Sequence, residues 1–269
     1  MRGYVITGIV VFVVVVLACL LLPAHSHVQG QAARFQCTNN LKSIVLAAHC
    51  YHDTNGSFPR GTHVHGELPP EERLSWMVTL LPFIEQDNVF KAIDMEEGWQ
   101  SAKNKSAVNT RIKMYLCPAV FDPNRPNLAN ATHYVGLTGL GDDSALLPKE
   151  SPRAGLFGYD RVVSLEDIKD GTSATIMVIE TNATPGPWAA GGISTLRAVN
   201  ADDQPYIGVG RPFGGMHVRE RSWFRKEQHL VSVGLADGSG RWLDESINPQ
   251  TFEALVTIAG GEKIDADDY

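Results

Sequence analysis

The sequence predicts an α+β fold in which one long N-terminal helix packs on a β-sheet. An uncharged apolar run at 4–22 is followed by an amphipathic stretch at 32–53, the pattern becomes β-rich after Cys117, and 249–259 has the pattern of a short terminal helix. The chain has 269 residues, of which 43% are hydrophobic, which is enough for a sizeable core.

The first element is the apolar run Tyr4–Leu22, which contains no charged residue. At 1.5 Å rise per residue, such a helix spans about 28 Å, close to the roughly 30 Å hydrocarbon core of a bilayer. We therefore expect a transmembrane anchor over residues 1–23. Two alternatives stay open: a cleaved signal peptide with Arg2 in its positive region, and a lipoprotein signal that ends at Cys19.

The charges around this run set its orientation. Arg2 precedes it, and Arg34 is the first Lys or Arg after it. The positive-inside rule then predicts a single-pass protein of the cytoplasmic (inner) membrane, with its N-terminus inside and its body in the periplasm or outside the cell.

The next segment, 24–31, is small and polar, and is either a flexible neck or a weak part of a continuous helix; Pro23 is compatible with both. Residues 32–53 then repeat apolar side chains at helical spacing. This stripe consists of Cys37, Leu41, Ile44, Val45, Ala48 and either Tyr51 or His52. Asn55-Gly56 is expected to end the helix, because glycine accepts the left-handed cap conformation. We expect 32–269 to form a single exported domain.

Further elements follow in order. Pro82 is typical of a first helical turn, so we expect a helix that runs to about Asp94 with Glu85 near its start. Residues 182–212 are rich in Pro and Gly and are expected to be irregular. Alternation and β-branched content predict five strands, at Arg111–Cys117, His133–Leu137, Thr175–Glu180, Leu230–Leu235 and Gly240–Leu243.

Charge and motif content exclude several functions. The net charge of −7 argues against nucleic-acid binding. The sequence has no C-x-x-C pair and no G-x-S-x-G motif, so a zinc ribbon and a serine hydrolase lack support. His217 and Asp237 could form a catalytic or metal dyad, but Asp237-Gly238 is more simply a hairpin turn. We predict no enzyme activity, no metal and no cofactor.

Short motifs in a fixed order carry a family resemblance. They comprise Asn39, Asn40 and Leu41 after Cys37; Trp76; Pro82, Glu85 and Gln86; Cys117; and His217, Asp237 and Gly238. Together they resemble the planctomycete family called domain of unknown function 1559, whose C-terminal motif is H-x9-DG.

The resemblance implies a pilin-like or pseudopilin-like architecture, with the second half of the helix packed on an antiparallel sheet. It implies a structural or interaction role without catalysis, with the membrane and other pilin-like subunits or secretion machinery as partners. One name of the family points to solute binding. Trp188, Trp223 and Trp242 in loops therefore motivate an alternative, a periplasmic or surface module that binds a solute or glycan.

The chain departs from the family pattern in two places. Family members begin with Gly-Phe-Thr-Leu-x-Glu, a prepilin peptidase site, whereas Gly3–Gly8 here is followed by no glutamate. The absence of this peptidase site favours a single-pass membrane anchor that is not cleaved over a subunit of a filament. The spacing between His217 and Asp237 is 19 residues instead of nine, which indicates a basic, aromatic insertion at 218–228.

Cys37 and Cys117 occupy the two family cysteine positions. The resemblance, taken together with the expected export of the domain, implies a disulfide between them. That bond would close a loop of about 80 residues and contribute roughly 4–5 kcal/mol in the chain-entropy model. The alternative is two buried thiols. Cys50 is expected to be a small buried residue.

Overall fold

In a computed structural model, the described residues are 2–63, 66, 68–120, 130–214, 217–219, 227–262 and 264. For 2–11 and 13–29 only the helical backbone is described. Within the described part of the chain, no helix combines the length and apolar character needed to cross a bilayer. The side chains of the predicted anchor Tyr4–Leu22 lie outside that part, apart from Phe12, so the anchor stays a prediction.

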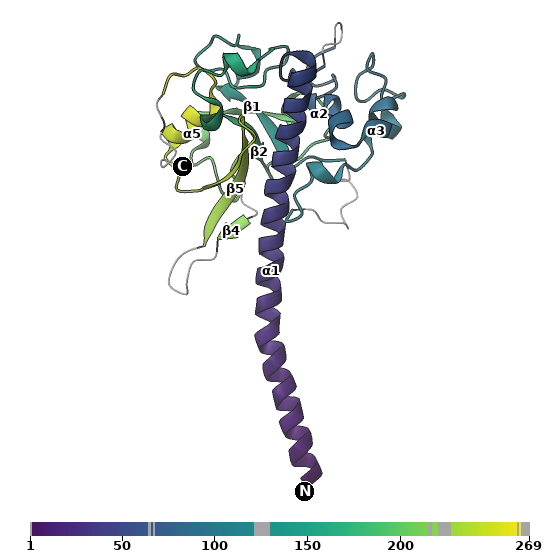
Figure 1. Cartoon of the computed structure of the whole chain (residues 1–269), viewed down its shortest axis with the longest axis vertical. Coiled ribbons are helices and arrows are strands. Elements are labelled where there is room, and N and C mark those ends of the chain that lie inside the picture. Colours follow the sequence, from purple (N-terminus) through teal and green to yellow (C-terminus); the bar gives the residue numbers. More distant parts are fainter. Residues whose placement is uncertain are drawn as a thin grey trace.

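The longest element is α1, a continuous helix from Arg2 to Asn55. Its first half extends away from the rest of the chain, and its second half lies against the sheet (Figure 1). The backbone stays helical through Pro23 and 24–31, as in the second interpretation of that segment. Gly56 ends α1 with φ 78° and donates its N–H to the His52 carbonyl at 2.7 Å, which confirms the predicted cap.

The sheet is mixed and has six strands in the order β3-β1-β2-β5-β4, with β6 also paired to β5. Their bounds are β1 Tyr134–Leu140, β2 Ile176–Glu180, β3 Leu196–Val199, β4 His217–Arg219, β5 Gln228–Leu235 and β6 Gly240–Asp244. The β1–β3 pair is parallel and the others are antiparallel. The expectation of an antiparallel sheet was therefore wrong for β3, because 182–212 supplies a crossover strand where we expected only irregular chain.

Short helices complete the fold. They are α2 Trp76–Thr79, α3 Asp87–Lys91, α4 Lys105–Val108 and α5 Pro249–Val256.

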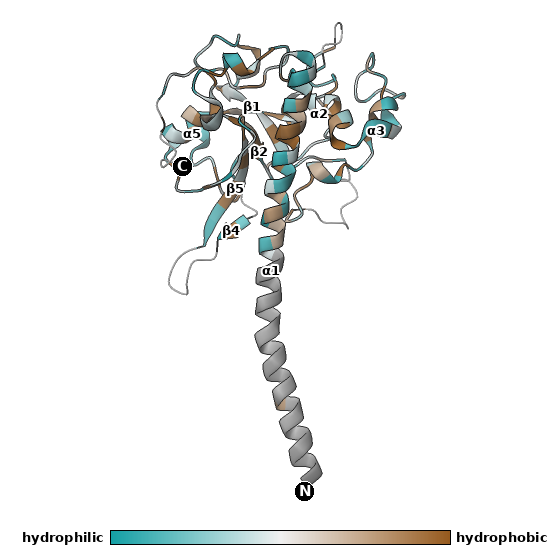
Figure 2. Cartoon of the chain, in the orientation of Figure 1, coloured by the Kyte–Doolittle hydropathy of each residue, from teal (hydrophilic) through white to brown (hydrophobic). Residues whose placement is uncertain are grey.

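The sheet separates two apolar clusters. Neighbouring side chains of a strand point to opposite faces, so in β1 Tyr134 joins the cluster that contains the α1 stripe, while Val135 joins the one that contains Phe252 of α5. Figure 2 shows hydrophobic (brown) and hydrophilic (teal) residues mixed along the half of the α1 ribbon that lies against the sheet. The predicted stripe residues Cys37, Leu41, Ile44, Val45 and Ala48 are fully buried, whereas Tyr51 and His52 at its end are half-buried.

Two predicted elements were wrong. The expected helix from Pro82 to Asp94 is broken at Glu85, which has φ 61° and ends a 3-10 turn, Leu81–Ile84, so α3 begins only at Asp87. The expected strand Arg111–Cys117 is instead a 3-10 turn at Lys113–Tyr115. Of the alternating apolar side chains, Ile112 and Leu116 are buried and Met114 is half-buried, without strand pairing. Cys50 was also misassigned, because it is exposed on the outer side of α1.

Candidate functional site

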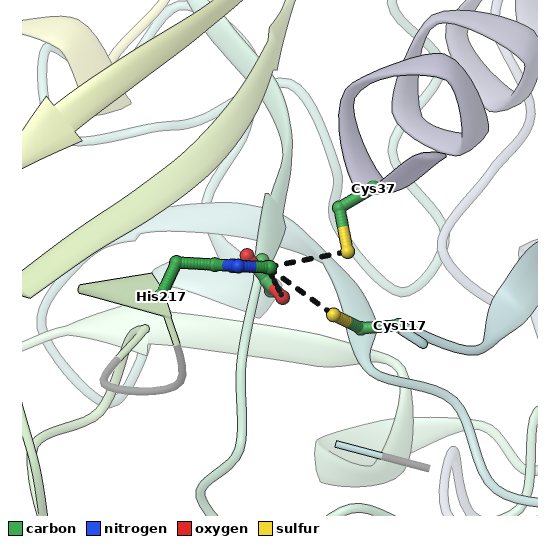
Figure 3. Close-up of side chains that lie close together, drawn as sticks. Cys37, Cys117 and His217 are labelled. Carbon is green, nitrogen blue, oxygen red and sulfur yellow. Dashed lines mark hydrogen bonds and ion pairs between the residues drawn. The ribbon is translucent and has the colours of Figure 1, made fainter. Parts of the chain in front are cut away.

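Four buried side chains from distant parts of the chain meet where α1 leaves the body. Cys37 comes from α1, Cys117 from the loop after the Lys113–Tyr115 turn, Glu180 from the end of β2 and His217 from the start of β4. We call these four residues the buried cluster. One donor atom from each lies within 4.8 Å of the others, and Figure 3 shows the two cysteines and His217 pointing toward one another.

The imidazole of His217 is the hub of the buried cluster. Its Nε2 lies 3.2 Å from Cys37 Sγ, 3.3 Å from Cys117 Sγ and 3.2 Å from Glu180 Oε1. The ring also meets Trp242 edge to face, with centroids 5.0 Å apart. Strand pairing fixes this position, because His217 is opposite Leu230 of β5.

Hydrogen bonds hold the other members in place. The Asn40 side chain donates to the Leu116 carbonyl at 3.1 Å, and the Cys117 N–H donates to His133 Nδ1 at 3.0 Å. The Ser232 N–H donates to the second Glu180 oxygen at 3.4 Å. The motif residue Asn40 thus positions the segment that carries Cys117.

Proximity shifts the protonation equilibria of the buried cluster. A hydrogen bond with Cys117, together with His217, lowers the pKa of Cys37 to about 7 despite burial. Burial raises the pKa of the Cys117 thiol far above its usual value, and the negative groups beside it act in the same direction. Burial alone would lower the pKa of His217, but its contacts with Cys37 and Glu180 outweigh this and raise it to about 9.

This arrangement can do two kinds of chemistry. A thiolate beside an imidazolium is the pairing of a catalytic cysteine. However, Cys37 and Cys117 are 0% exposed, Glu180 is 1% and His217 is 3%, so a substrate cannot reach the sulfur in this conformation. Two sulfurs, an imidazole nitrogen and a carboxylate oxygen are also a donor set for a transition-metal ion.

The dyad of His217 and Asp237, the less favoured interpretation of these two residues, is not formed. Asp237 is exposed in the β5–β6 turn, where its Oδ1 accepts from the Ser239 N–H at 2.8 Å and Gly238 has φ 90°. Leu230, opposite His217, is seven residues before Asp237, roughly 20 Å along the strand. The turn interpretation of Asp237-Gly238 is confirmed.

The remaining motif residues have structural positions. Leu41 and Trp76 are fully buried, and Trp76 donates its indole N–H to the Thr195 carbonyl at 3.1 Å. Asn39 is exposed. Pro82, Glu85 and Gln86 form the turn before α3, where the Gln86 N–H donates to the Leu81 carbonyl.

Cys37 and Cys117 lie together, as the predicted pairing requires, but both are free thiols here. The covalent bond stays a prediction. Glu180 was missed by sequence reasoning; its only signal was an acidic residue at the end of the apolar strand Ile176–Ile179.

The tryptophans that motivated solute binding do not line an open site in the described residues. Trp188 is fully buried and donates to the Thr110 carbonyl at 2.9 Å, Trp242 packs against the core, and Trp223 lies outside the described residues. Two surface hollows of about 460 and 440 Å³ are lined instead by residues such as Arg161 and Tyr51, respectively.

Fold and site together define an α+β protein with one long N-terminal helix and a buried sulfur, nitrogen and oxygen cluster. The model of the family described as "Protein of unknown function (DUF1559)" matches residues 30–250, well over half of the chain, so the chain belongs to that family. Comparisons with curated proteins and with solved structures give no match.

Proposed function

We propose that this protein is a single-pass, membrane-anchored, exported pilin-like protein that acts through structure or interaction, without catalysis. The main support for the proposal is that the two halves of α1 differ in sequence and position. Its first half bears the uncharged run Tyr4–Leu22, and its second half supplies the core stripe that packs on β5 and β6. One helix thus serves as tether and as core element.

The outward face of α1 supports an interaction role. Phe35 and Leu46 are 71% and 63% exposed. They are eleven residues apart, which is close to three helical turns, so they share one side of the helix. Large apolar side chains on an exposed helix face are the kind of surface that a second helix would cover.

Membrane extraction tests the anchor. We expect the full chain to stay in the membrane pellet at alkaline pH and to dissolve only with detergent. A Val13→Arg, Val15→Arg variant is the control, since each central arginine costs about 2.5–3.5 kcal/mol of insertion. Recovery of the unaltered chain in the soluble fraction without detergent would contradict the anchor.

Cys50 tests the orientation. It is exposed on α1, whereas Cys37 and Cys117 are buried. A membrane-impermeant maleimide added to spheroplasts should label the chain at Cys50, and Cys50→Ser should abolish the label. Labelling that appears only after lysis would place the body on the cytoplasmic side.

Crosslinking tests the interaction surface. A bis-maleimide should join neighbouring chains through Cys50 if their α1 helices pack together. Phe35→Asp should weaken this crosslink, and Gln36→Asp, at an adjacent exposed polar position, should leave it unchanged. An absent crosslink, or one that is insensitive to Phe35→Asp, would argue against contact between copies through this face.

A further inference from the structure

Three possible hydrogen-bond partners of the buried cluster crowd around one ring nitrogen, His217 Nε2. Two sulfurs and a carboxylate oxygen all lie 3.2–3.3 Å from His217 Nε2. A ring nitrogen carries at most one hydrogen, so three acceptors cannot each receive one from it. A cation between the four donor atoms would satisfy all of them at once.

Burial strengthens this argument. Glu180 is 1% exposed, and its described charge partner is His217. An uncompensated buried carboxylate or thiolate costs several kcal/mol, so such groups are normally paired or coordinate metals. A single imidazole ring here faces two sulfurs and a carboxylate oxygen, so a cation would find these donors already gathered at one place.

We propose that Cys37, Cys117, Glu180 and His217 together bind one Zn²⁺ ion. The donors are two thiolates, one imidazole and one carboxylate, which suit the borderline-soft Zn²⁺. Structural zinc sites have four protein ligands, while catalytic sites keep a position open for water. Because all four side chains are buried, this site is structural.

The distances are close to those of a tetrahedral site. With Zn–N and Zn–O near 2.0–2.1 Å and Zn–S near 2.3 Å, adjacent donors in a tetrahedron lie roughly 3.4–3.8 Å apart. The observed separations from Nε2 are 3.2–3.3 Å, and all four donor atoms lie within 4.8 Å of one another, so the donors move by about 1 Å or less on binding. No strand or helix has to be displaced for that adjustment.

The site joins the tether to the body. Among the described side chains of α1, Cys37 is the first that is buried. It lies 180 residues from His217 along the chain, and the other two ligands come from β2 and from the loop after the Lys113–Tyr115 turn. Zinc would therefore fix the point at which α1 leaves the sheet, independently of whether the helix is embedded in a membrane.

A disulfide between Cys37 and Cys117 is the competing chemistry. It would need a sulfur–sulfur distance of about 2.05 Å, and it would give no role to Glu180 and His217, which also converge here. The two states exclude each other, since a disulfide removes both thiolate ligands. Thiol counting and metal analysis on the same sample therefore distinguish them.

Metal content of the full chain is the first test. Purified in detergent without chelators or metal-affinity resin, the protein should carry about one zinc per chain by mass spectrometry, with Cys37 and Cys117 in unoxidised form. Cys117→Ser should lose the metal. Cys50→Ser is the matched control and should keep it, because Cys50 is exposed and outside the cluster.

Cobalt substitution is a second test that needs no cysteine variant, so it remains valid if such a variant fails to fold. The reduced, unaltered chain with Co²⁺ should show sulfur-to-cobalt charge transfer and the visible bands of a tetrahedral site, and Zn²⁺ should displace them. Glu180→Gln, which preserves side-chain size, should weaken zinc affinity by about tenfold or more.

Three outcomes would overturn the proposal: a metal-free protein in which Cys37 and Cys117 form a disulfide, a reduced protein that gives no cobalt–thiolate spectrum, or a Cys50→Ser variant that loses zinc as Cys117→Ser does.

Discussion

Gly234 lies in β5 directly against α1, and an alanine there tests how tightly helix and sheet pack. A Cβ on Gly234 would lie 2.7 Å from Val45 Cγ2, while the next neighbours, both atoms of Leu41, are at 3.7 and 3.8 Å. Carbon atoms in contact are normally 3.5–4.0 Å apart, so about 1 Å must be gained. The clash involves one methyl group of one side chain.

Val45 cannot easily turn away, because valine in a helix strongly prefers a single χ1 rotamer. Gly234→Ala should therefore destabilise the chain by about 1–3 kcal/mol, as is usual for overpacking. Val45→Ala alone should cost about 2 kcal/mol through lost burial and a cavity. In the double variant the new methyl occupies part of that cavity. The loss of stability in the double variant should therefore be about 1–2 kcal/mol smaller than the sum of the two single losses.

The assay is denaturant unfolding of the full chain in detergent, followed by the fluorescence of the buried Trp76 and Trp188. Gly30→Ala is the control, because no neighbouring atom lies within 4 Å of its added Cβ; it should not destabilise the chain and, as alanine is the better helix former, should add at most about 1 kcal/mol of stability. Additive effects of Gly234→Ala and Val45→Ala would refute the packing of α1 over β5.

Three further predictions concern polar groups that make several hydrogen bonds. Asn104→Ala should lower the free energy of unfolding by about 2–3 kcal/mol in a denaturant titration, because the Asn104 side-chain amide forms hydrogen bonds with four backbone groups of 94–98. Asn109→Ala, at an exposed position, should lower it far less. Arg161→Lys should cost about 2–4 kcal/mol, since one ammonium cannot serve the four carbonyls that the guanidinium bonds, and an unchanged midpoint would refute this. Burial raises the pKa of Asp167, but bonds from Lys149 and Ser164 lower it below its usual 3.8. The carboxylate therefore stabilises the fold above pH 3.8 and this contribution is lost as pH falls further, so Asp167→Asn should flatten the acid limb of a stability–pH curve; an unchanged limb would contradict the assignment.

Local patterns predicted much of the fold. The α1 stripe, the Gly56 cap and the Asp237-Gly238 hairpin each depend on neighbours in sequence, and each was found. The parallel strand β3 and the break at Glu85 were missed because tertiary pairing and one left-handed residue overrode the local pattern.

The candidate site shows the same limit. The resemblance pointed to Cys37 and Cys117, and His217 was noted for its motif. Asp237 was offered as a possible partner of His217 but was preferred as part of a hairpin turn, and the turn is what the structure has. Glu180 could not be found because strand register, not sequence spacing, sets its position next to His217. Four residues spread over 180 positions meet only in the folded sheet.

The contact between α1 and β5 also sets the order in which the molecule can form. Val45 and Gly234, which face each other, are made 189 positions apart, and chains emerge N-terminus first. The helix stripe is therefore synthesised long before the strands that cover it. The apolar side of the helix therefore stays without its covering strands until the last quarter of the chain has been made.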